Sequence, residues 1–62
     1  MFEEELRRKI ERLEAELVSE EEKYINAVKS HDNYVTLRGI RNTIRTIKEE
    51  LQSLYRQQES RI

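Results

Sequence analysis

Four basic side chains that recur at three- and four-residue spacing have the clearest potential for chemistry in this chain. On a helix this spacing places them along one side, where a row of cationic groups can contact phosphates. The row consists of Arg38, Arg41, Arg45 and Lys48. The same row forms ion pairs when acidic residues of another helix lie beside it, and such exposed pairs contribute only about 0–1 kcal/mol each. The row therefore indicates a solvated, ion-paired helix face first and a nucleic-acid contact second.

Catalytic and metal chemistry find little support among the other residues. The chain has no cysteine and a single histidine, His31, so it offers no thiolate and no second ligand type beside the imidazole. Its carboxylates are numerous, but a thin helical protein has no enclosed pocket that would shift their pKa values. We expect a protein that is not an enzyme and that binds no cofactor or metal.

One enzyme class merits a direct comparison at the level of its motif. Small two-helix aspartyl-phosphate phosphatases of the sporulation type carry Ser-Gln-Glu-Leu-Asp on their second helix. The corresponding stretch here, residues 48–52, reads Lys-Glu-Glu-Leu-Gln. Only Glu50 and Leu51 match, and Gln52 stands where the motif ends in Asp. This activity remains a second alternative whose motif is not matched.

The composition favours long helices. Among the 62 residues, 40% are charged and 35% are hydrophobic, with no Pro and one Gly. Folds rich in turns need more Gly and Pro, whereas this Glu-, Lys-, Arg- and Leu-rich composition is typical of coiled coils. A chain of this length forms at most one domain. With no apolar run long enough to cross a membrane and no signal peptide, we expect a cytoplasmic protein or part of an intracellular or viral assembly.

The stretch from Leu37 to Leu54 carries apolar residues at alternating spacings of three and four, the a/d pattern of a helix packed on another helix. A matching stripe runs through residues 6–27, and the only turn-like cluster, residues 30–33, separates the two. We predict an all-α, coiled-coil-like antiparallel hairpin with helices at about 2–29 and 34–58. Ser30 or Asp32 is the expected N-cap of the second helix. The predicted seam consists of Leu6, Ile10, Leu13, Leu17, Tyr24, Leu37, Ile40, Ile44, Ile47, Leu51 and Leu54.

Folding the chain back at residues 31–32 aligns positions whose numbers add to about 64, and nearly every facing pair then joins an a to a d position. Residues 1–31 carry a charge balance of −3 and residues 32–62 a balance of +2, so the two halves attract. Glu14 is expected near Lys48, and Glu21 near Arg41.

Two residues interrupt this regular pattern. Glu20 occupies a d position, where a long side chain packs its stem and extends its carboxylate to water, or else contacts a partner. Gly39 falls on the outer face of the second helix. Either this solvent-exposed position simply tolerates Gly, or the absence of a side chain lets the backbone of another chain approach closely.

Apolar residues remain after the seam is filled, and they form a second face that is strongest near the loop. Exposed apolar patches usually mark a contact site. We expect self-association into a dimeric four-helix bundle, or binding of a helical partner protein, and hence a non-enzymatic adaptor, regulator or assembly component. A nucleic-acid-binding hairpin similar in shape to regulators of the Rop type is the alternative. The predicted contact face consists of Val18, Ile25, Val28, Tyr34 and Tyr55, with Val35 and Ile62 as further unpaired apolar residues.

Overall fold

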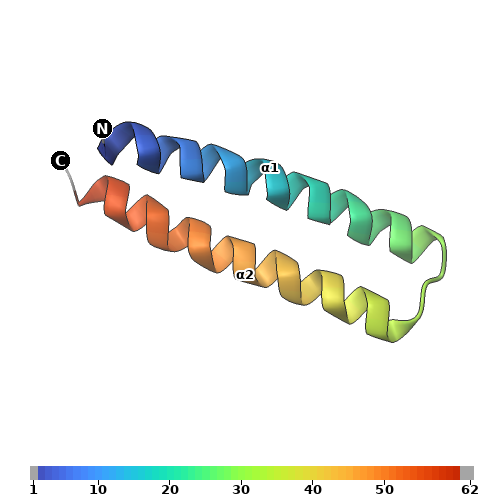
Figure 1. Ribbon diagram of the computed structural model, residues 1–62. Helices are drawn as coiled ribbons and strands as arrows, with labels where there is room; N and C mark the ends of the chain where they lie inside the picture. The colour runs from blue at the N-terminus through green and yellow to red at the C-terminus, as the bar shows by residue number, and fades with distance from the viewer. Residues whose placement is uncertain (1, 61–62) are drawn as a thin grey trace.

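A computed structural model describes residues 2–60 of the chain, with side chains from Glu3 onward. It contains helix α1, Phe2–Lys29, and helix α2, Tyr34–Glu59, which pack against each other as an antiparallel hairpin (Figure 1). The predicted all-α hairpin is therefore confirmed, and α2 ends one residue beyond the expected Gln58. Ile62, which we expected on the second face, lies outside the described residues.

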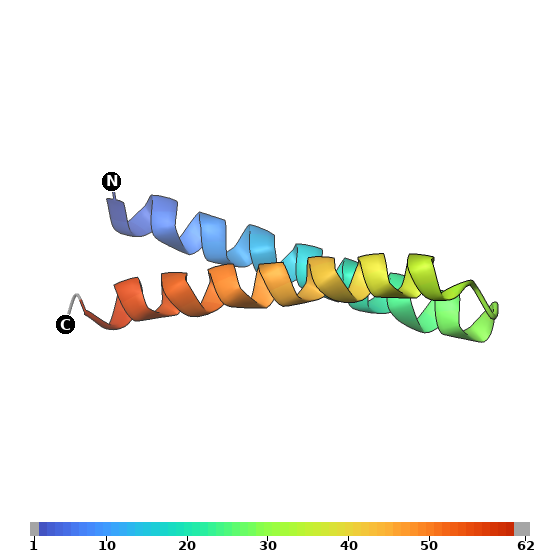
Figure 2. The ribbon, with the colours of Figure 1, turned by 90° about the horizontal axis from the view of Figure 1, so that it is seen from below.

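The hairpin is a thin rod about 46 Å long. The first turn of α1 and the last turn of α2 lie at one end of it and the loop at the other, and the two helices cross at a shallow angle (Figures 1 and 2). Neither α1 nor α2 combines the length and the apolar content that crossing a membrane requires.

The first turn of α1 is stabilised by charge. Glu3, Glu4 and Glu5 lie at the N-terminus and Lys29 lies in the last turn. Acidic groups are favourable at the positive end of the helix dipole, and basic groups at its negative end. The sequence thus specifies where α1 begins and ends as well as which of its faces packs.

The loop begins with a left-handed residue that ends α1. His31 has a φ of 57°, and its N–H donates to the carbonyl of Val28 at 3.1 Å. The N–H of Asp32 donates to the carbonyl of Ala27 at 3.0 Å. This pair of bonds is a Schellman motif, in which Gly is the usual left-handed residue and His is a less common one. The motif satisfies two carbonyls at the end of α1 and turns the chain toward α2.

Asn33 is the N-cap of α2. Its backbone is extended, with φ −70° and ψ 163°, and its side-chain Oδ1 accepts from the N–H of Thr36 at 2.9 Å. The expectation that Ser30 or Asp32 would cap α2 was therefore wrong. Ser30 and Asp32 belong to the turn that ends α1, so the next residue with a capping side chain takes the position.

The predicted seam lies between the helices. Leu6, Ile10, Ile47 and Leu51 are buried and form one cluster. Leu13, Leu17 and Leu54 are half-buried and pack against that cluster, so the expected facing positions in this part of the rod belong to one core. The remaining seam residues are also half-buried, namely Tyr24, Leu37, Ile40 and Ile44.

Packing is uneven along the rod. The buried cluster lies in the half that holds the chain ends, whereas the loop half contributes only Ala27 to the buried set. Within the described range no large side chain falls below 2% exposure. A chain of this size without metal or disulfide rarely gains more than about 3–5 kcal/mol from one core. The loop half therefore has apolar surface left to bury.

Replacing Gly39 with Ala should stabilise the hairpin by about 1 kcal/mol, because Gly is the weaker helix former. A methyl group added at Gly39 would meet no atom within 4 Å. For a domain this small, the gain corresponds to a rise of about 4–8 °C in Tm, measured by circular dichroism. A fall in Tm that appears only at high protein concentration would instead reveal another chain packed closely against Gly39.

Candidate interaction groove

An open groove of about 1170 Å³ runs along one side of the loop half, between α1 and α2. Ile25 lines it from α1 and Tyr34 from α2, and both belong to the predicted contact face. The seam residues Tyr24 and Ile44 line it as well and are half-buried. The groove therefore provides an apolar strip that continues the surface of the seam.

The basic row lines the same groove. Arg38, Arg41, Arg45 and Lys48 all contribute to its wall, and Glu21 is the acidic residue that lines it with them. The contact face and the basic row were separate predictions from the sequence, and the fold brings members of both to one surface. The resulting surface is apolar and cationic together.

The groove continues toward the chain ends as a second hollow. Arg45 and Lys48 line both hollows, and Leu17, Gln52 and Tyr55 line the second one. Val18 and Val28 are exposed on α1 but line neither hollow. The predicted contact face thus divides into three groove residues, Ile25, Tyr34 and Tyr55, and two valines on the adjacent surface of α1.

The expected ion pairs across the helices do not form among the described residues. Glu14 does not reach Lys48, and Glu21 does not pair with Arg41; the ion pair that the structure shows there joins Glu20 to Lys23. The four cations of the basic row thus have no ion-pair partner within residues 3–60. The prediction came from the heptad positions of the charges alone, and it did not account for the Tyr55 hydroxyl, which hydrogen-bonds to the Glu14 carboxylate.

Glu14 instead accepts a hydrogen bond from the Tyr55 hydroxyl at 2.6 Å (Oε2 to Oη), which links the two helices. This hydrogen bond, together with partial desolvation and the nearby negative charge of Glu14, raises the pKa of Tyr55 above its usual value. Sequence reasoning placed Tyr55 on an exposed face and missed this contact. The sequence does indicate this contact, because Glu14 and Tyr55 both occupy the heptad position that flanks the seam on the same side.

The Tyr55–Glu14 hydrogen bond predicts a specific loss of stability at alkaline pH. The folded-state pKa of Tyr55 lies above the unfolded value near 10.0, so the folded chain keeps a proton that the unfolded chain loses. The stabilisation is complete below that pH and disappears as pH rises through the folded-state pKa. Tyr55→Phe should therefore be less stable than wild type at neutral pH, with a difference that shrinks above pH 10. Urea titrations across this range measure it, with Tyr34→Phe as the control, and a difference that is independent of pH would contradict the link.

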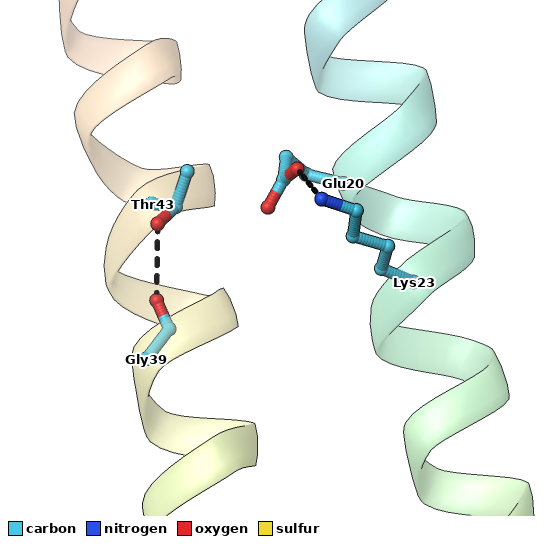
Figure 3. Close-up of polar contacts among 4 residues, drawn as sticks. All are labelled: Glu20, Lys23, Gly39 and Thr43. Atoms are coloured by element: carbon cyan, nitrogen blue, oxygen red, sulfur yellow. Dashed lines mark hydrogen bonds and ion pairs between the residues drawn. The ribbon is translucent and has the colours of Figure 1, made fainter.

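Glu20 places a carboxylate in the seam. Its side chain is only 17% exposed and pairs with the Lys23 ammonium at 2.9 Å (Oε2 to Nζ), on the side of α1 that faces α2 (Figure 3). On α2, the Thr43 hydroxyl donates to the Gly39 carbonyl at 3.1 Å, so its proton is already used. The carboxylate is thus satisfied from within α1, by a residue three positions along the same helix.

Along the chain as far as residue 60, no three His, Cys, Asp or Glu side chains gather where they could hold a metal ion. In the stretch compared with the phosphatase motif, Leu51 is a core residue and Glu50 and Gln52 are exposed. Comparison of the chain with known protein families, curated proteins and solved structures gave no match.

Proposed function

We propose that this chain is a non-enzymatic helical interaction module that pairs with a second copy of itself to form a four-helix bundle. The groove between α1 and α2 is the contact surface. The observation that carries this proposal is the apolar strip left open along the loop half, where Ile25 is 52% exposed beside half-buried seam residues.

Energetics support the pairing. The hairpin buries one stripe of each helix, and large apolar side chains on its surface, including Ile25, Val28 and Tyr34, remain exposed. Burying apolar surface stabilises by about 25 cal/mol for each Å² removed from water. A second hairpin laid on this side completes a two-layer core, which is the usual way for two-helix chains to acquire an interior.

Replacing Ile25 with Asp should shift the chain from dimer to monomer over the accessible concentration range while most of the helical signal remains. The charge would be buried within the contact, where an unpaired carboxylate is costly. Val28→Asp should act in the same direction but less strongly, because Val28 lies beside the groove. Sedimentation and light scattering at several concentrations measure the mass, and circular dichroism reports the helix content.

Val35→Asp is the matched control. Val35 is 77% exposed on α2 and does not line the groove, so the same change there should leave the mass of the dimer unchanged. A monomeric wild-type chain at all concentrations, or an Ile25→Asp variant with the mass of wild type, would overturn the proposal.

Nucleic-acid binding is the second candidate function, and one observation favours it. Arg38, Arg41, Arg45 and Lys48 line a single groove without ion-pair partners within the described residues. Unpaired cations in a row are available to phosphates, and binding of this kind weakens as salt concentration rises.

Exchange of Arg38 and Arg45 for Glu should abolish a salt-sensitive gel shift with RNA or DNA if this second function exists. The double variant Arg8→Glu and Arg56→Glu makes the same change in charge at exposed positions outside the groove, and it should retain more binding. Absence of any shift by wild type at low salt would exclude this function.

A further inference from the structure

We infer that the two copies align with their loops at the same end, so that α1 of each copy lies across α2 of the other. This inference rests on the proposed self-association and adds its geometry. It makes α1 of a second copy the occupant of the cationic side of the groove. The two-fold axis then runs along the rod.

The first argument is the position of the apolar surface. Ile25, Val28 and Tyr34 are all exposed and all lie within the loop half of the rod. Alignment with loops together brings this surface against the same surface of the second copy. A reversed alignment over the full length would place it against the acidic first turn of α1, where Glu4 and Glu5 lie. Only the first alignment packs the apolar surface of each copy against the apolar surface of the other.

The second argument is charge complementarity. The cations of the groove belong to α2, whereas Glu21, the acidic residue that lines it with them, belongs to α1. Glu14, also on α1, contacts Tyr55 of the second hollow, to which α2 contributes Glu49. With loops together, Glu21 of one copy lies level with the segment between Arg41 and Arg45 of the other. Glu14 lies close to the level of Lys48. Each carboxylate thus approaches cations that have no ion-pair partner among the described residues of their own hairpin.

Desolvation makes this pairing necessary. A dimer formed on the groove covers its charged walls as well as its apolar strip, and a covered charge without a partner is strongly destabilising. Reversed alignment over the full length lays α2 on α2 and brings Arg45 of one copy level with Lys48 of the other. Like charges would then meet at the centre of the contact, and the acidic residues of α1 would lie away from the cations.

The rod length makes the two alignments easy to distinguish. The chain contains no cysteine, so a single label can be attached at Asp32→Cys in the loop, or at Glu59→Cys at the opposite end. Intermolecular distances between spin labels, measured by pulsed electron resonance on the full chain, should be well under half of the 46 Å rod for either variant. A mixture of the two singly labelled chains should give a distance comparable to the rod length.

Each outcome decides a different question. Dimers whose Asp32→Cys labels are separated by about the rod length would overturn this alignment and leave the proposed self-association intact. Assemblies that keep growing with concentration would also overturn it, because two-fold pairing is closed. A chain that stays monomeric shows no intermolecular distance, and that result removes both the alignment and the proposed function.

Discussion

Truncation of Leu51 to Ala is expected to lower the free energy of unfolding by about 2–5 kcal/mol. Leu51 is 4% exposed and belongs to the buried cluster with Leu6, Ile10 and Ile47. Truncation removes apolar contacts and leaves a cavity that two stiff helices cannot close fully. Since a core of this size supplies about 3–5 kcal/mol, the variant should be largely unfolded at room temperature.

The loss is measured by the helical signal in circular dichroism and by urea titration at a fixed chain concentration, because association adds to apparent stability. Val35→Ala is the matched control, since Val35 is exposed and should change stability little. A Leu51→Ala variant with the Tm of wild type would show that the buried cluster does not hold the two helices together.

Replacement of Glu20 with Leu is expected to raise the stability of the hairpin by about 1–2 kcal/mol, because it fills a polar layer of the seam with an apolar side chain. Glu20 is half-buried opposite the predicted position of Ile44. The Lys23 ion pair that is lost contributes little, since the side chain of Lys23 is 63% exposed.

This gain in stability should be accompanied by a loss of specificity. A polar residue at a seam position fixes register and oligomeric state at a cost in stability, so its removal allows alternative pairings. Glu20→Leu should therefore melt at higher temperature yet show a broader distribution of masses in sedimentation. Glu20→Gln keeps the polar layer and should retain the mass distribution of wild type. A lower Tm for Glu20→Leu would contradict the assignment of Glu20 to the seam.

The architecture was predictable from the spacing of a few residues. The three- and four-residue alternation from Leu37 to Leu54 predicts a helix with one packed face, and the matching stripe in residues 6–27 predicts its partner. The polar cluster at residues 30–33 locates the turn. Periodicity works here because burial along a helix depends on angular position, which residue spacing fixes directly.

Details that depend on competition between neighbours were not predictable in this way. Three residues near the turn can act as caps, and only the left-handed backbone at His31 makes Asn33 the one that caps α2. Likewise, Glu14 has two available partners, and it accepts from Tyr55 instead of pairing with Lys48. Choices of this kind are decided by short-range geometry, which heptad position alone does not specify.

The sequence predicts the residues that line the groove, but it does not predict that they lie on one surface. The sequence indicates an apolar second face and, separately, a basic row. That Ile25, Tyr34 and the basic row line one hollow depends on how the two helices are rotated about their axes. A surface that is apolar and cationic together limits its partners more strictly than either feature alone, because an occupant must supply both apolar contact and negative charge.

The most direct test is a nuclear Overhauser experiment on an equimolar mixture of isotope-labelled and unlabelled chains, which separates contacts within a chain from contacts between chains. Contacts between the methyl groups of Leu17 and Ile47 should arise within one chain, and contacts of the Ile25 methyl groups should arise between chains. Seam contacts found only between chains would mean that the helices do not fold back on each other. Intermolecular contacts that are absent at Ile25 and present elsewhere would mean that the groove is not the self-association surface.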